Sequence, residues 1–139
     1  MALSQNVKAV EERLAAAARA AGRNPAEITL CAGTKVQTDD TIRAAIAAGI
    51  RLCGENRVQE LTAHLEANAY AGAEVHFIGH LQTNKVKQVV GKVSLIHSVD
   101  SDRLLRAIEA QADRLGLVQD ILLEVNVARE ESKGGCLPA

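Results

Sequence analysis

Aromatic residues are almost absent from this chain of 139 residues, which has one tyrosine, one phenylalanine and no tryptophan. Hydrophobic residues nevertheless make up 47% of the sequence. The core must therefore be packed from Ala, Val, Leu and Ile, which suits helices laid against β-branched strands. The length allows one domain with a sizeable core and is short for two.

Several kinds of binding motif are missing too. The net charge is −1 and the basic residues are scattered, so no positive patch for nucleic acid is visible. The phosphate loops Gly-x-x-x-x-Gly-Lys and Gly-x-Gly-x-x-Gly do not occur, and nothing else indicates a loop for nucleotide phosphates.

The sequence also lacks the features of membrane and secreted proteins. No apolar stretch approaches the roughly 18 residues that a membrane span needs, and no cleavable apolar leader follows Met1. The three cysteines, Cys31, Cys53 and Cys136, are odd in number and form no Cys-x-x-Cys motif. This pattern favours free thiols in a reducing compartment, so we expect a soluble cytoplasmic protein without a membrane partner.

What the chain does contain is a regular alternation of two hydrophobic periods. A short capped turn is expected at Asn24-Pro25, where the proline suits a first helical position. Helical spacing predicts helices over residues 4–21, 38–48, 56–67, 83–90 and 101–115, and short apolar runs predict strands over residues 28–32, 51–54, 75–78, 93–97 and 120–127.

This order predicts an α/β fold in which a parallel sheet is covered by helices. Two architectures fit, an open five-stranded sheet or the first five strands of an eight-stranded barrel. A complete barrel needs about 200 residues or more, so this chain cannot close one alone. Residues 129–139 form a polar tail with no helix to cover the last strand. No linker interrupts residues 1–139, which we expect to be a single unit that lacks its C-terminal continuation.

Polar residues follow each predicted strand, at the edge where parallel α/β folds bind ligands. They are Thr34 and Lys35, Glu55 and Asn56, His80, Gln82 and Asn84, Ser98 and Asp100, and Arg129, Ser132 and Lys133. Lys35 is unusual because it follows an apolar run, where partial burial would disfavour the ammonium form and free the amine to attack an aldehyde. An arbitrary lysine is more often an ordinary exposed loop residue, and position alone does not overturn that interpretation.

The histidines give weaker signals. His76 and His80 have a spacing that binds metal on a helix, but here they straddle a strand and its loop, so their rings should not share a face. We therefore expect no metal site, and a packing or hydrogen-bonding role for His76. His64 lies mid-helix and is expected to face solvent.

Three segments become recognisable together: Ala32 to Lys35 (AGTK), Gly54 to Glu60 (GENRVQE) and His76 to Lys85 (HFIGHLQTNK). They resemble the YggS/PROSC family of pyridoxal 5′-phosphate (PLP) homeostasis proteins. Asn126 and the Glu-Ser-Lys-Gly-Gly run at residues 131–135 resemble the end of that family's fifth strand. The resemblance covers essentially the whole chain, in order.

The resemblance implies a TIM-type (β/α)8 barrel like the N-terminal domain of alanine racemase, of which this chain carries about five βα units. It implies PLP as the cofactor, held as an imine on Lys35, with Asn56 near it. It also implies a role in PLP (vitamin B6) homeostasis without established catalysis, so that no catalytic residue is expected. The partners would then be PLP itself and PLP-dependent apoenzymes.

The chain departs from the family pattern in several places. Thr34 replaces a serine, Gly33 replaces a bulkier residue, and Val75 stands where an aromatic is common. The last three barrel strands, which carry the phosphate-binding loop and the arginine near the pyridine nitrogen, are absent. Three alternatives therefore stay open: a PLP-dependent racemase or decarboxylase, a truncated barrel fragment without function, and a flavodoxin-like binding module. The open edges of the first and fifth strands could also drive self-association.

Overall fold

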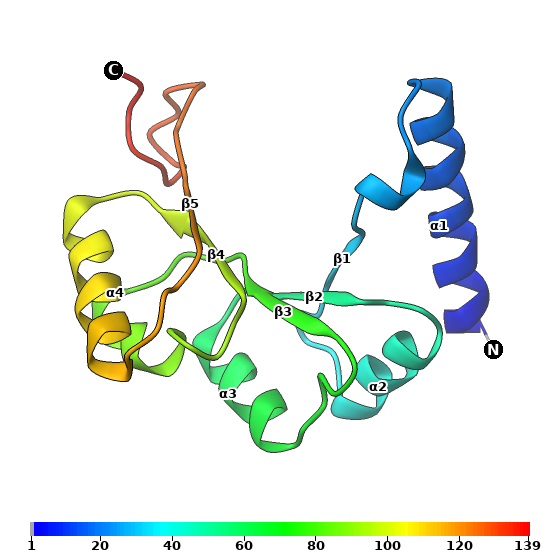
Figure 1. The fold of residues 1–139 in the computed structure, drawn as a ribbon, viewed down its shortest axis with the longest axis horizontal. Helices are drawn as coiled ribbons and strands as arrows, with labels where there is room; N and C mark the ends of the chain where they lie inside the picture. Colours follow the sequence, from blue (N-terminus) through cyan, green and yellow to red (C-terminus); the bar gives the residue numbers. More distant parts are fainter. Residues whose placement is uncertain (1) are drawn as a thin grey trace.

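A five-stranded parallel sheet in the order β1-β2-β3-β4-β5 organises the computed structural model, which describes residues 2–139 (Figure 1). The strands are β1 Cys31–Gly33, β2 Leu52–Glu55, β3 Glu74–Phe77, β4 Leu95–Val99 and β5 Ile121–Leu123. Each strand pairs with the next one along the chain. This sequential order is that of a β/α barrel, whereas a doubly wound sheet reverses its order at a switch point. The flavodoxin-like alternative is therefore wrong.

The helices connect the strands as the sequence predicted, with one change of type. They are α1 Ala2–Ala20, α2 Asp39–Ala47, α3 Val58–Glu66 and α4 Asp102–Leu115, with the 3-10 helices η1 Pro25–Glu27 and η2 Thr83–Gln88. The helix expected over residues 83–90 is thus a 3-10 helix. No helix within residues 2–139 is long and apolar enough to cross a membrane.

The helix ends follow from local chemistry. The side chain of Thr38 accepts a hydrogen bond from the backbone N–H of Thr41 at the start of α2, and Ser101 does the same for Leu104 at the start of α4. Such caps satisfy amide groups that have no partner inside the helix. Gly116 ends α4 in the left-handed conformation at φ 66°, which glycine adopts without steric cost.

The two faces of the sheet have different environments. Cys53, Val75, Phe77 and Ile96 point toward the helices and belong to the buried core. Side chains alternate along a strand, so His76 lies on the opposite face, where it contacts His97. In Figure 1 the helices α2, α3 and α4 line one side of the curved sheet, and no helix crosses the other side. The molecule is therefore a partial barrel, and the predicted fold class is confirmed.

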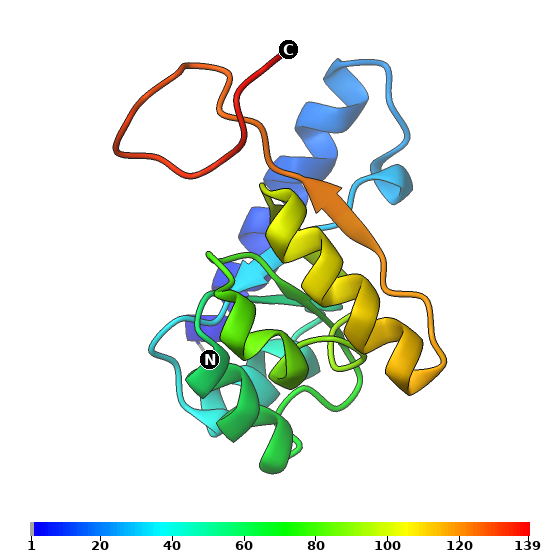
Figure 2. The same ribbon diagram turned by 90° about the vertical axis from the view of Figure 1, so that its left-hand side faces the viewer.

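The last strand is shorter than the predicted range of 120–127. Only Ile121–Leu123 pair with β4, with a register shift between Ile96 and Val99, and Val125 instead forms an isolated parallel bridge with Cys136. The chain after β5 loops outward, as Figure 2 shows, and returns to that bridge. Leu122 is 48% exposed and Leu123 67%, so apolar side chains line this edge of the sheet.

Candidate functional site

The carboxyl ends of β1 and β2 meet around one buried side chain, that of Glu55. Its residue is 0% exposed, although it carries a carboxylate at the end of β2. One oxygen, Oε2, accepts hydrogen bonds from the Thr34 hydroxyl at 2.6 Å and from the Tyr70 hydroxyl at 3.0 Å. The other oxygen, Oε1, accepts from the backbone N–H of Asn56 at 3.1 Å. A buried polar group is stable only with such partners, so this network determines the local geometry.

Tyr70 acts in this network as a permanent donor. Burial raises the pKa of its hydroxyl above the usual range, and the neighbouring Glu55 raises that pKa further. Burial also raises the pKa of the Cys53 thiol to about 11, with smaller contributions from Cys31 and Glu55. Neither group ionises near neutral pH, so Tyr70 remains a neutral donor to Glu55.

Lys35 follows directly after the anchored residue Thr34. The backbone N–H of Thr34 donates to the carbonyl of Gly54 at 3.0 Å, which extends the β1–β2 pairing up to the residue before the lysine. Lys35 itself lies in a turn and is exposed. The expected partial desolvation of this amine is therefore wrong, because Lys35 is exposed in the turn after β1. A Cβ placed on Gly33 would meet nothing within 4 Å, so the space beside the end of β1 is open.

Asn56 lies at the end of the neighbouring strand and is half-buried. The third strand end packs directly on its backbone, because a Cβ built on Gly79 would lie 2.1 Å from the Asn56 carbonyl oxygen. Only glycine permits this approach. The structure thus brings together the ends of β1, β2 and β3. Lys35 follows Thr34, whose hydroxyl binds Glu55, and the backbone N–H of Asn56 binds the same carboxylate.

The predicted polar residues at the other strand ends have varied surroundings. His80, Gln82 and Asn84 are exposed, and so are Arg129, Ser132 and Lys133 in the tail. Asp100 accepts a hydrogen bond from the backbone N–H of Gly135 at 3.1 Å, which ties the tail to the end of β4. Asn126 binds both backbone groups of Glu130 and shapes the loop after β5.

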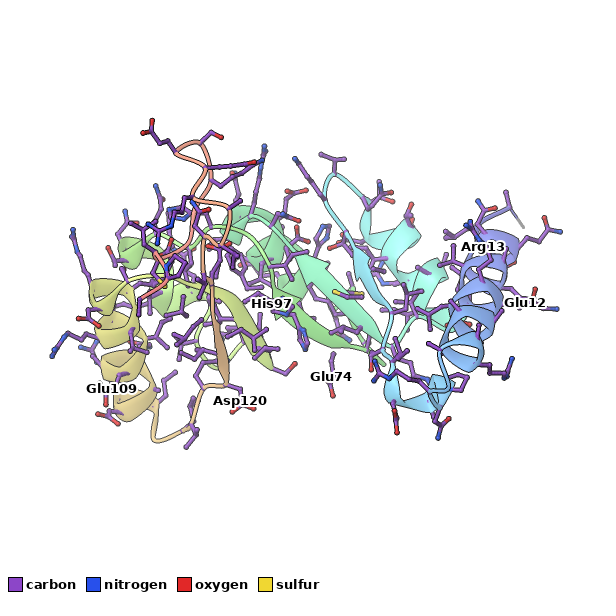
Figure 3. All side chains as sticks on the ribbon, turned by 90° about the horizontal axis from the view of Figure 1, so that it is seen from above. Glu12, Arg13, Glu74, His97, Glu109 and Asp120 are labelled. Atoms are coloured by element: carbon purple, nitrogen blue, oxygen red, sulfur yellow. The ribbon has the colours of Figure 1, made fainter. Side chains whose placement is uncertain are left out.

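The histidines differ most from expectation. His64 was expected to face solvent but is buried, with Nδ1 2.6 Å from the Asp39 carboxylate and its ring packed edge-on against Tyr70. His76 does not pair with His80, in line with the prediction. Its Nδ1 lies 2.9 Å from Nε2 of His97, and its Nε2 lies 3.9 Å from Glu74. Figure 3 shows the labelled His97 and Glu74 near each other in the middle of the molecule, between α1 and α4.

No group of three or more His, Cys, Asp or Glu within residues 2–139 is arranged to hold a metal ion.

Sequence reasoning missed the roles of Tyr70 and Gly79. A signal for Gly79 was present in the sequence, since a glycine directly after a strand marks a close backbone approach. Nothing local marked Tyr70, because its partner Glu55 is 15 residues away.

Comparisons with known proteins agree with this geometry. No family model matches the chain. Individual pyridoxal phosphate homeostasis proteins are similar to it. That of Aquifex aeolicus is 43% identical over 134 residues, and the match covers 96% of this chain and 59% of the relative. That of Pseudomonas aeruginosa is 35% identical over 136 residues, covering 98% and 59%.

Solved structures give the same result. A protein of unknown function from Bifidobacterium adolescentis is 41% identical with a TM-score of 0.88, and the match covers 96% of this chain and 58% of that one. PipY of Synechococcus elongatus, solved with PLP bound, is 35% identical with a TM-score of 0.74, covering 91% and 57%.

The chain spans a little under three fifths of the length of each of these relatives. Sequence and fold agree across nearly all of its own residues. It belongs to the family of pyridoxal phosphate homeostasis proteins.

Proposed function

We propose that this chain binds PLP as an imine on Lys35, beside Asn56, and serves intracellular PLP homeostasis as a carrier. The observation that carries the proposal is the position of Lys35. Its amine is exposed at the carboxyl end of β1, and the residue before it is held by the buried Glu55. PLP bound there supplies an aldehyde, which condenses reversibly with a primary amine and releases water.

The residues around Lys35 fit such a ligand. The open space beside Gly33 leaves room for a ring next to the amine. Asn56 offers an amide on a backbone held by the hydrogen bond from its N–H to Glu55 and by the close packing of Gly79. The homologue PipY was solved with PLP bound, which supports the same ligand class here.

A carrier is favoured over a racemase or decarboxylase by the state of the nearby acid–base groups. Glu55 is fully buried and already accepts three hydrogen bonds. Tyr70 is bonded to Glu55 and has a pKa raised by burial. Neither group is available to move a proton on a ligand at Lys35.

We further propose that residues 1–139 are the N-terminal portion of a (β/α)8 barrel. The relatives extend well beyond the matched region, and the β5 edge exposes apolar side chains. Fusing the remaining segment of the Aquifex aeolicus relative to this chain should tighten PLP binding. If the extended protein bound PLP no better than the chain alone, the missing strands would not contribute to the phosphate site, and this part of the proposal would fail.

The three cysteines are unpaired in the structure, which supports a cytoplasmic location.

The function itself is tested by titrating the purified chain with PLP while following the imine absorbance. Borohydride reduction and peptide mapping then locate the bond. The proposal expects a saturable signal fixed on Lys35 and lost in Lys35→Ala, with Lys92→Ala as the exposed control. Label spread evenly over many lysines would refute a specific site and favour the reading of a fragment without function.

A further inference from the structure

The backbone directly after Lys35 is strained. Val36 has φ 57°, in the left-handed region that a β-branched side chain rarely adopts, and the side chain itself is 74% exposed. Packing of the side chain therefore does not explain this conformation. Strained residues persist only where the surroundings hold them, and they cluster at functional sites.

A hydrogen bond from a neighbouring βα unit holds this turn. The backbone N–H of Val36 donates to Oε1 of Glu60 at 2.8 Å. Glu60 lies in the first turn of α3, on the helix that follows β2. Its other oxygen is buried and has no hydrogen-bond partner among residues 2–139. The bond to Val36 is thus the contact through which this carboxylate acts.

Two glutamates of one βα unit therefore hold the two neighbours of Lys35. Glu55 at the end of β2 binds the Thr34 side chain before the lysine, at 2.6 Å. Glu60 binds the Val36 backbone after it, at 2.8 Å. The turn is closed internally by the N–H of Gln37, which donates to the carbonyl of Thr34 at 3.0 Å. Lys35 is fixed at its backbone on both sides, while its amine stays exposed.

We propose that Glu60 is a positioning residue for Lys35, which it orients by holding Val36 in the left-handed conformation. The relevance to PLP rests on the proposed function, whereas the effect on the backbone does not. Without the Glu60 bond, Val36 relaxes to an ordinary negative φ and the turn carrying Lys35 changes direction. The direction in which the Lys35 side chain leaves the end of β1 then changes, and the positioning of the amine is what makes such a reaction fast and selective.

Backbone hydrogen exchange at residue 36, measured by NMR on the full chain, tests the hydrogen bond without any ligand. Glu60→Ala should speed exchange of this amide about fivefold, the loss expected for one hydrogen bond. Glu60→Gln keeps an acceptor oxygen and should stay within about twofold of the parent chain. Unchanged exchange in Glu60→Ala, with circular dichroism showing that the variant is folded, would overturn the proposal.

Trapping of PLP by borohydride tests the consequence for Lys35. Glu60→Ala should lower the fraction of label on Lys35 about fivefold relative to the other lysines. The double variant Glu60→Ala/Val36→Gly should recover the parent fraction, because glycine adopts a positive φ without support. The proposal is contradicted if the double variant does not recover the labelled fraction and Glu60→Gln lowers it as much as Glu60→Ala does. Glu60 would then act through its charge and not through the hydrogen bond to Val36.

The two measurements separate the failure of this inference from that of the proposed function. If the parent chain does not label Lys35 but Glu60→Ala speeds exchange at residue 36, PLP binding fails and the backbone role stands. If Lys35 is labelled normally in Glu60→Ala, the positioning role is wrong and the PLP site stands.

Discussion

The hydroxyl of Thr34 lies 2.6 Å from the buried carboxylate of Glu55 and donates a hydrogen bond to it. This contact joins the ends of β1 and β2 one residue before Lys35. The family pattern has a serine at this position, and the threonine here supplies the same hydroxyl group, which binds Glu55. A serine could make the same bond, so the replacement by Thr34 preserves the network.

Removing the acceptor of this network should destabilise the fold more than removing one donor. Tyr70→Phe deletes one hydroxyl and should lower the free energy of unfolding by about 1–2 kcal/mol. Glu55→Ala leaves the buried Tyr70 hydroxyl without its acceptor and the Thr34 hydroxyl with only the Gly54 carbonyl at 3.2 Å, and should cost about 3 kcal/mol or more. Urea denaturation measures both, with the exposed Glu66→Ala as control. Equal effects of Tyr70→Phe and Glu55→Ala would contradict the role of Glu55 as the shared acceptor.

Alanine substitution of two glycines at strand ends should change the stability by very different amounts. A Cβ at residue 79 would lie 2.1 Å from the Asn56 carbonyl oxygen, whereas a Cβ at residue 33 would meet nothing within 4 Å. Gly79→Ala should therefore cost about 3 kcal/mol of stability and weaken PLP binding through the displaced Asn56. Gly33→Ala should change stability by at most about 1 kcal/mol. Thermal unfolding compares the pair, and a tolerated Gly79→Ala would show that the loop yields.

Acid should destabilise the chain through His76. Burial lowers the pKa of this imidazole, the adjacent His97 lowers it further, and Glu74 opposes them. Below the unfolded pKa of about 6.5, the unfolded chain then binds more protons than the folded one. The free energy of unfolding should fall as the pH drops from about 7 through 6.5 toward the lower folded pKa.

The test is a series of urea denaturation curves between about pH 5 and pH 8, a range that brackets the unfolded histidine pKa. His76→Gln should flatten the decrease, while the exposed His80→Gln should keep it. The assignment is wrong if the His76→Gln variant shows the same pH slope as the parent chain.

The open edge at β5 should make the isolated chain self-associate. Leu123 is 67% exposed on the edge strand, and unpaired strand edges with apolar side chains promote association. Leu123→Lys should shift the chain toward the monomer in sedimentation equilibrium, because a lysine on an edge strand opposes further pairing. Val118→Lys, a change at a residue that is 91% exposed but lies before the strand, should not. A parent chain that is monomeric at high concentration would refute this prediction.

Local signals in the sequence were sufficient for the elements themselves. The alternation of helical and strand periods predicted five parallel strands, and Thr38 and Ser101, with which two predicted helix ranges begin, cap those helices in the structure. These features depend on residues within a few positions of each other. The short β5 and the 3-10 geometry of η2 depend on neighbouring strands and helices, and the sequence predicted a longer strand and an ordinary helix there.

Side-chain partners across the sheet were decided by the tertiary structure. His64 was expected to face solvent, but the packing of α3 against α2 brings Asp39 to its ring, 25 positions away in the chain. His76 finds His97 because β3 and β4 are neighbours in a particular register. A helical or strand period cannot contain this information, since it says which face a residue lies on and not what lies opposite.

Short motifs and local hydrophobic periods were enough to predict the α/β alternation, the family and the lysine at the end of the first strand. These motifs lie within short segments whose chemistry is local. The contacts of Glu55 and Glu60 with the two neighbours of Lys35, and the exposure of Lys35, follow instead from the packing of the folded chain. Both glutamates are more than 20 positions from the neighbour of Lys35 that they bind. Parallel pairing of β1 with β2 brings them there, because it places the start of α3 beside the turn that follows β1.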